Sequence, residues 1–224
     1  MKRGISIAMD GPGSAGKGTV ARGVARALGY QYIDTGSMYR AVALYARRSG
    51  IPWSDQVQLA RLASALRFRF VWNGDVLRVE VDGEDVTREI REDVVGQGAS
   101  NVSVHPLVRT TLVELQRALA AEGGGVVDGR DVGTVVLPDA ELKVFLEAGL
   151  DERARRRHDE LARRGEPVSF ASVRDALEAR DKQDRERAAS PLKAAPDAIH
   201  VDSSDLTIRQ AIDAVLALAH QRGA

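Results

Sequence analysis

A glycine-rich segment near the start of the chain limits most strongly what this protein can fold into. The segment from Gly11 to Thr19 reads G-P-G-S-A-G-K-G-T, and it separates a short apolar run, Ile5 to Met9, from a stretch with helical spacing of apolar residues. Glycines let backbone N–H groups curl around an anion, and the N-terminus of a following helix adds its positive end. The spacing G-x-x-x-x-G-K therefore predicts a phosphate-binding loop between a buried strand and a helix.

Within this loop, Lys17 is predicted to bring a mobile positive charge to the β- and γ-phosphates of ATP. The next residue is Gly18 rather than Ser or Thr, so the hydroxyl that helps to hold Mg²⁺ in many such loops comes one place later, at Thr19. We expect Thr19 to act on Mg²⁺ largely through water. A glycine-rich turn without a ligand is the alternative, and the flanking strand and helix argue against it. The predicted ATP contacts in the loop are Gly11, Pro12, Gly13, Ser14, Ala15, Gly16, Lys17, Gly18 and Thr19.

Short apolar runs alternate with helical patterns along the rest of the chain, which is typical of an α/β fold with a parallel sheet wrapped by helices. The 224 residues are enough for one such domain. Further strands are predicted near 32–33, 126–127, 142–146 and 199–201. Helices are predicted after the loop and at 37–48, 106–121, 151–164, 169–187 and 208–219. We assign the core of a single domain to residues 1–34, 123–148 and 188–224.

Between residues 68 and 86 the hydrophobic period changes to two. Apolar and polar residues alternate on both sides of Asn73-Gly74-Asp75, which is a strong signal for a hairpin turn. The pattern predicts a small antiparallel β insert within the region 35–122. An edge hairpin on the main sheet is the alternative.

Composition excludes several classes of function. The chain has no cysteine, which rules out disulfides, zinc thiolate sites and cysteine nucleophiles. Lys plus Arg (32) equals Asp plus Glu (32), so no large basic surface for nucleic acid is indicated. The apolar run before Asp10 is too short for a signal sequence or a membrane span. We therefore expect a cytoplasmic protein without nucleic-acid or membrane partners.

Three further motifs carry groups that suit a second phosphate. The first, D-T-G-S-M-Y-R at 34–40, offers a bidentate fork at Arg40 and hydroxyls at Thr35 and Tyr39. The second, D-G-R-D-V-G-T at 128–134, follows a predicted strand. The third, R-D-K-Q-D-R-E-R at 180–187, places Arg180, Asp184 and Arg187 at i, i+4 and i+7, on one helix face. Taken alone, that third motif favours a solvated helix face with an intrahelical Arg180–Asp184 pair that contributes little to stability.

Together with the G-K-G-T loop and the β insert, these motifs resemble bacterial cytidylate kinases, a family of P-loop nucleoside monophosphate kinases. The resemblance runs over nearly the whole chain. It implies transfer of the γ-phosphate of ATP to CMP or dCMP with Mg²⁺, and it implies a monomer. It also implies that residues 149–168 form a lid that closes over ATP and excludes water. One departure is the order Gly13-Ser14, where Ser-Gly is more usual, and we expect it to be neutral.

The resemblance also assigns roles within the acceptor site. Arg180 and Asp184 are expected at the ribose, and Arg130 and Arg187 at the acceptor phosphate. Asp131 is expected to accept from the cytosine N4, with Ser100 and Arg109 as donors or supports for the base edge. The complete predicted CMP-binding set is Thr35, Tyr39, Arg40, Ser100, Arg109, Arg130, Asp131, Arg180, Asp184 and Arg187.

Arginines of the predicted lid complete the catalytic set. At least one of Arg153 and Arg157 is expected to reach the phosphates of ATP. The acceptor oxygen is already ionised, so no general base is required, and no histidine stands in any motif. The predicted catalytic residues are Lys17, Arg130, Arg157 and Arg187.

Alternatives from other classes fit the sequence less well. Adenylate, guanylate and shikimate kinases share the loop, but the β insert and the Tyr39-Arg40 pair count against each of them. A regulatory GTPase needs an Asn-Lys-x-Asp tetrad, and the sequence has none. A motor ATPase needs an apolar strand ending in Asp-Glu, whereas Val126-Val127-Asp128 is followed by glycine.

Overall fold

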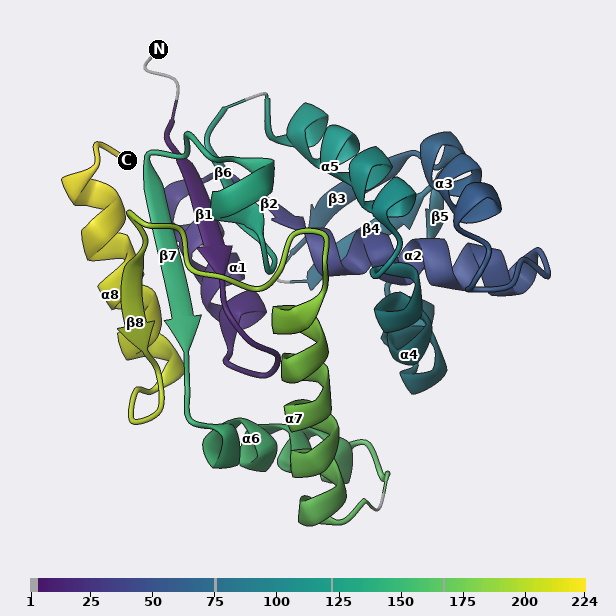
Figure 1. The fold of residues 1–224 in the computed structure, drawn as a ribbon. Coiled ribbons are helices and arrows are strands. Elements are labelled where there is room, and N and C mark those ends of the chain that lie inside the picture. The colour runs from purple at the N-terminus through teal and green to yellow at the C-terminus, as the bar shows by residue number, and fades with distance from the viewer. Residues whose placement is uncertain (1–3, 75, 122, 167) are drawn as a thin grey trace. The chain divides into compact units, whose positions relative to one another are not determined.

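The computed structural model describes residues 4–74, 76–121, 123–166 and 168–224. The predicted α/β fold is confirmed, because five strands form one sheet in the order β2-β6-β1-β7-β8 and three form a separate sheet in the order β3-β4-β5 (Figure 1). The chain divides into two compact units, a first unit of Met1–Tyr30 with Gly123–Ala224 and a second unit of Gln31–Glu122.

The first unit is built on parallel strands. Strand β1 pairs with β6 on one side and β7 on the other, and β7 pairs with β8. The residues at the centre of these strands, including Ile7, Val127 and Leu146, are fully buried, as expected for a sheet covered on both faces. The strands are β1 Ser6–Asp10, β6 Gly125–Asp128, β7 Leu142–Glu147 and β8 Ile199–Asp202.

Among the described residues of this unit, four α-helices and one short π-helix accompany these strands. Helix α1 packs against β6 and α8, and α6 packs against α7 (Figure 1). The helix α1 ends at Gly29, whose φ of 66° is a left-handed conformation that glycine adopts without strain. The α-helices are α1 Lys17–Leu28, α6 Leu150–Arg163, α7 Phe170–Glu186 and α8 Ile208–Gln221, and the π-helix η2 is Val132–Val136.

In the part of the second unit that the structure describes, four α-helices are combined with the small sheet. Its core gathers large apolar side chains from α2, α3, the small sheet and α5, such as Met38, Leu59, Val81 and Leu112. Two of its helices, α3 and α4, are absent from the sequence-based prediction. The elements are β2 Gln31–Asp34, α2 Thr35–Arg48, α3 Gln56–Ala65, β3 Phe68–Asn73, β4 Val76–Val81, β5 Glu84–Asp85, the 3-10 helix η1 Glu89–Arg91, α4 Asp93–Val102 and α5 Pro106–Ala120.

The change of hydrophobic period is explained by the antiparallel sheet of the second unit. Strands β3 and β4 pair from Phe68 opposite Val81 to Asn73 opposite Val76, and β4 also pairs with β5. This sheet is separate from the main one, so the predicted insert is confirmed and the alternative of an edge hairpin is wrong. Asp75 of the predicted turn lies outside the described residues.

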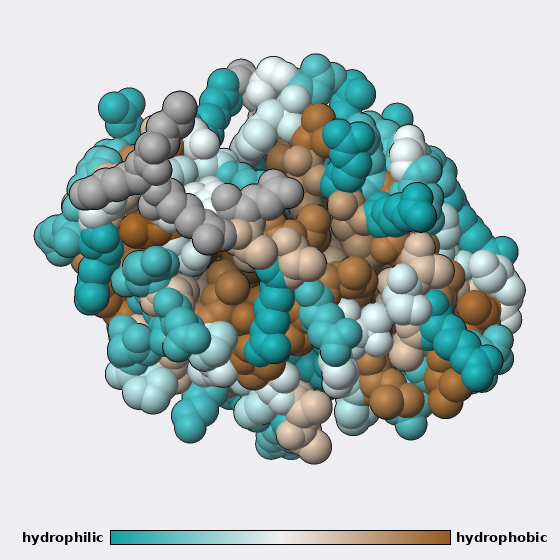
Figure 2. Space-filling view, turned by 90° about the horizontal axis from the view of Figure 1, so that it is seen from above, coloured by the Kyte–Doolittle hydropathy of each residue, from teal (hydrophilic) through white to brown (hydrophobic). Residues whose placement is uncertain are grey.

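Among the described residues, no helix combines the length and the apolar character needed to cross a membrane. Hydrophilic side chains, drawn in teal, cover much of the face shown in Figure 2.

Candidate active site

The phosphate-binding loop joins β1 to α1 in the first unit, as the sequence predicts. Two glycines are required by its backbone. Gly11 has a φ of 144°, and a Cβ there would stand 1.9 Å from the carbonyl oxygen of Leu146. Gly16 has a φ of 89° and caps α1, whose first turn contains no acidic residue. The loop therefore presents its backbone and the positive end of α1 without a competing carboxylate.

Lys17 is the first residue of α1, and its side chain returns along the loop. Its Nζ donates a hydrogen bond of 2.8 Å to the carbonyl oxygen of Pro12. Burial, followed by the positive charge of Arg130, lowers the pKa of Lys17 to about 7. A phosphate group bound in the loop places negative charge beside this amine and so favours its protonated form.

Asp10, the last residue of β1, joins this loop to the D-G-R-D segment. Its two carboxylate oxygens accept hydrogen bonds from the backbone N–H groups of Val132 (2.8 Å) and Gly133 (2.7 Å). Burial raises the pKa of Asp10 to about 6, against the opposing effect of those two hydrogen bonds. The sequence reveals Asp10 only as the residue that ends an apolar run, because both partners lie more than 120 positions away along the chain.

We expect Asp10→Asn to change how stability depends on pH. The native protein binds the Asp10 proton more tightly than the unfolded chain does between pH 3.8 and about 6, so this group's contribution to stability falls as pH rises through that window. The stability of wild type relative to Asp10→Asn should therefore be greater at pH 4.5 than at pH 7, by about 2 kcal/mol. Urea unfolding at the two pH values measures the difference, and an equal gap at both would contradict the assignment.

A cluster of opposite charges lies around Asp184 on α7, in the same unit. Arg130 Nε donates to Asp184 Oδ2 at 3.0 Å, and Arg187 Nη1 lies 3.5 Å from Asp184 Oδ1. Arg187 Nη2 lies 3.8 Å from Asp131 Oδ1. Burial acts to raise the pKa of Asp184, but Arg130, Arg180 and Arg187 outweigh it and lower that pKa overall. The structure thus gathers Arg130, Asp131, Asp184 and Arg187 into one network of charges that are buried or partly buried.

The phosphate loop borders this cluster. A Cβ built on Gly13 would lie 3.7 Å from Arg130 Nη2 and 3.7 Å from Leu177 Cδ2 of α7. Two of the predicted site segments that are more than 100 residues apart in the sequence, the loop and the D-G-R-D motif, are therefore neighbours in the first unit.

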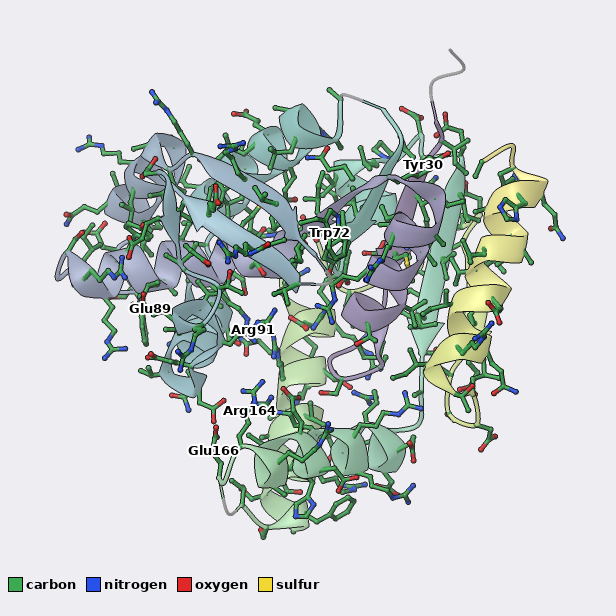
Figure 3. The ribbon with its side chains drawn as sticks, turned by 180° about the vertical axis from the view of Figure 1, so that it is seen from behind. Tyr30, Trp72, Glu89, Arg91, Arg164 and Glu166 are labelled. Carbon is green, nitrogen blue, oxygen red and sulfur yellow. The ribbon has the colours of Figure 1, made fainter. Side chains whose placement is uncertain are left out.

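The segment predicted as a lid corresponds to α6 and the connection to α7. These two helices share a small apolar core of Ala154, Leu161, Val173 and Leu177. Arg164 and Glu166 lie at the turn that joins the two helices (Figure 3).

The two predicted lid arginines have different surroundings. Arg153 is buried, and its guanidinium donates to the main-chain carbonyls of Ala148 and Gly13. Arg157 is partly exposed and pairs with Glu160 at 3.0 Å. The prediction that one of them reaches ATP remains a prediction, and the position of Arg157 suits it better.

The sequence analysis assigns no role to Arg156, which lies between Arg153 and Arg157 on α6. Its Nη1 donates to the carbonyl oxygen of Ala15 (3.4 Å) and its Nη2 to the carbonyl oxygen of Ser203 (2.6 Å). Ser203 Oγ donates to the same Ala15 carbonyl at 3.0 Å. A run of arginines in a sequence does not indicate which of the side chains faces the phosphate loop.

The second unit holds the remaining predicted acceptor residues. Thr35 begins α2 directly after Asp34, whose carboxylate caps the helix by accepting from Ser37 N (3.0 Å). The guanidinium of Arg109 lies over the ring of Tyr39, 5.4 Å from its centroid. Both residues are buried, so within this unit the structure brings Tyr39 and Arg109 together.

Arg40 and Ser100 both lie close to Gly96 of α4. Arg40 Nη1 donates to the carbonyl oxygen of Ile90 (3.0 Å), and a Cβ built on Gly96 would lie 3.2 Å from the same nitrogen. Ser100 Oγ donates to the carbonyl oxygen of Gly96 at 3.4 Å. A larger residue than glycine at position 96 would press on the Arg40 guanidinium.

Comparison with known proteins identifies the family. A profile of the family described as cytidylate kinase matches residues 7–221. A cytidylate kinase from Geobacter sp. (strain M21) is 46% identical over 212 residues, which cover 95% of this chain and 91% of the relative. The chain belongs to the cytidylate kinase family. A cytidylate kinase from Pelotomaculum thermopropionicum is 50% identical over 213 residues, which cover 95% of this chain and 94% of the relative. The resemblance inferred from the motifs is confirmed, and so is the enzyme class, because cytidylate kinases are phosphotransferases.

The comparison with solved structures shows that this cytidylate kinase family member shares its fold with other proteins, and it shows no more than that. A protein from Eubacterium ventriosum, described as uncharacterized, aligns with a TM-score of 0.52 at 11% identity. The alignment covers 96% of this chain and 98% of that one.

Proposed function

We propose that the protein transfers the γ-phosphate of ATP to CMP or dCMP, giving ADP and CDP or dCDP. The observation that carries the proposal is the contact between the phosphate loop and the Arg130–Asp184–Arg187 cluster within the first unit. A loop suited to a triphosphate thus adjoins arginines suited to a second phosphate. A kinase that acts on a phosphorylated acceptor needs a donor-phosphate site beside a second site with positive charges, because both reacting groups are anionic.

The chemistry asks little of the protein beyond position and charge. The acceptor phosphate oxygen attacks the γ-phosphorus in line, and the bond to the ADP oxygen breaks without a covalent intermediate on the enzyme. Lys17 is placed to stabilise charge on the β- and γ-phosphates, and Arg130 and Arg187 to orient the acceptor phosphate and neutralise it. We expect Arg157 to approach the transferred group when the lid closes.

Mg²⁺ is expected to enter with ATP as part of the substrate. No group of three His, Asp or Glu side chains in the described part of the chain could hold a metal by itself. The described residues fit a Mg²⁺ ion whose ligands are mostly phosphate oxygens and water molecules. Thr19 remains the predicted contact, through water, since its exposed hydroxyl stands in the first turn of α1.

Recognition of cytosine is assigned by resemblance. Discrimination against uracil needs an acceptor facing N4 and a donor facing N3. Asp131 supplies a carboxylate and Arg109 a guanidinium, with Ser100 as a further hydroxyl. Arg180 and Asp184 are expected at the ribose, and Thr35, Tyr39 and Arg40 at the acceptor phosphate. We also infer a monomer that works in the cytoplasm on small nucleotides.

A substrate panel tests the proposal. ADP release from ATP and Mg²⁺ is measured with CMP, dCMP, UMP, AMP, GMP, shikimate or no acceptor. We expect strong turnover with CMP and dCMP, and at least about tenfold less with each other acceptor, because unpaired polar groups at a base edge cost roughly 1–3 kcal/mol. Faster turnover with another acceptor would overturn the assignment of Ser100, Arg109 and Asp131. Hydrolysis that ignores the acceptor would overturn the kinase itself.

A further inference from the structure

Arg153 and Asp181 form a buried ion pair between the two helices that follow β7. Arg153 Nη1 lies 2.7 Å from Asp181 Oδ2, and the two side chains are 5% and 4% exposed. Asp181 stands in the R-D-K-Q-D-R-E-R motif, but its position alone gives it no role. Its other oxygen, Oδ1, has no hydrogen-bond partner in the described part of the chain. Arg153 is therefore the direct ion-pair partner of this buried carboxylate in the described residues, and Arg130 adds a longer-range attraction.

The same guanidinium also holds the phosphate loop. Arg153 Nη1 donates to the carbonyl oxygen of Gly13 at 3.2 Å, and Nε donates to the carbonyl oxygen of Ala148 at 2.9 Å. The planar fork of arginine can serve three acceptors at once in this way, whereas a lysine ammonium cannot keep the same directions. One side chain thus connects the loop, the end of β7 and helix α7.

These partners leave Arg153 turned toward the protein. Its position on α6 and its positive charge predict a contact with ATP, but its guanidinium contacts the carbonyl oxygens of Ala148 and Gly13 and the carboxylate of Asp181. The atom that it fixes, the Gly13 carbonyl oxygen, belongs to a loop whose N–H groups must stay directed at phosphate. Asp181 lies three residues before Asp184, so the same pair also sets the position of the α7 turn that carries the acceptor cluster.

We propose that Arg153 and Asp181 are a pair of positioning residues. Asp181 orients the Arg153 guanidinium, and Arg153 holds the phosphate loop in its ATP-binding shape and in register with α7. The proposal rests on the proposed function for the identity of the donor nucleotide. It goes beyond that function in giving Arg153 a role without direct contact to ATP and in giving Asp181 a role at all.

The test is a double-mutant cycle on donor binding. Binding of the non-hydrolysable analogue AMP-PNP with Mg²⁺ is measured by calorimetry for Arg153→Gln, Asp181→Asn and the double variant. We expect each single change to weaken binding by about tenfold, because Arg153→Gln removes the donor to the Gly13 carbonyl and Asp181→Asn removes the carboxylate that orients that donor. The double variant should also be weakened by about tenfold rather than about a hundredfold, since both changes break one unit.

Further variants separate positioning from stability. Arg153→Lys should bind with intermediate affinity, because the ammonium keeps a charge near Asp181 but loses the fork. Arg155→Gln is the matched control, since Arg155 is on the same helix with a side chain 65% exposed, and it should bind like wild type. Thermal unfolding followed by circular dichroism establishes that each variant is folded. If the lone buried charge in either single variant prevents folding, the neutral double variant and Arg153→Lys still carry the test.

Two outcomes would overturn the proposal. If Arg153→Gln weakens binding but Asp181→Asn leaves it unchanged or tighter, Arg153 contacts ATP directly and Asp181 only restrains it. If every folded variant binds like wild type, the pair is structural. Failure of wild type to phosphorylate CMP would instead remove the proposed acceptor, and the cycle on AMP-PNP would still report on Arg153 and Asp181.

Discussion

Lys17→Ala should lower the kcat for phosphoryl transfer by about a hundredfold to a thousandfold. The amine is the charged side chain of the phosphate loop, and the reaction increases negative charge on the phosphates that the loop binds. Loss of its hydrogen bond to the Pro12 carbonyl should change the free energy of unfolding by only about 1 kcal/mol. Steady-state kinetics with saturating ATP and CMP measure the first effect, and urea unfolding measures the second.

Lys193→Ala is the control for the loss of a lysine, since Lys193 is exposed and stands in none of the predicted motifs. It should keep the activity of wild type. If Lys17→Ala instead retained activity within a few-fold of wild type, the phosphate loop would have been assigned wrongly. A large fall in stability together with lost activity would point to a mainly structural lysine.

Asp184→Ala should damage the acceptor side far more than the donor side. Asp184 accepts from Arg130 at 3.0 Å and lies 3.5 Å from Arg187, so its removal leaves two arginines without their shared carboxylate. Breaking a buried charge pair costs about 3–5 kcal/mol, part of which appears as misplacement of the arginines. We expect kcat/KM for CMP to fall by about a hundredfold, while the Kd for ATP changes by less than about threefold.

Stability offers a second measurement on the same variant. The folded-state pKa of Asp184 lies below its ordinary value of 3.8, so its stabilising contribution is present above pH 3.8 and is lost as pH falls through the lower value. Asp184→Ala should therefore be less stable than wild type at pH 7. Asp175→Ala changes an exposed residue on the same helix and should alter neither kinetics nor stability. Equal losses of ATP and CMP binding in Asp184→Ala would indicate a structural role.

The parts of the fold that follow local rules were predictable. The phosphate loop depends on glycines whose backbone conformation is local, and the β insert depends on a period of two around Asn73-Gly74. Helix α5 begins at Pro106 and shows regular apolar spacing, so the structure and the prediction differ by one residue at its end. Such features need no knowledge of distant neighbours.

Two helices of the second unit were missed for a physical reason. Helix α4 contains Gly96 and Gly98, which lower helix propensity, and a Cβ on Gly98 would stand 2.5 Å from the Trp53 ring. Packing against that ring, rather than propensity, explains why glycine occupies this helix. Helix α3 buries only Leu59 and Ala63, too few apolar residues to stand out as a pattern.

The sequence by itself determined the kinds of chemical group that this protein offers: a loop for a triphosphate, arginines for a second phosphate, no cysteine, and no histidine in any motif. Only the tertiary structure decided which of these groups touch one another. Asp184 pairs with Arg130, 54 residues away, and Arg153 contacts Gly13, 140 residues away. Charged side chains of one type are equivalent in a sequence, because partner choice depends on burial and on distances that arise when the strands of a parallel sheet come together.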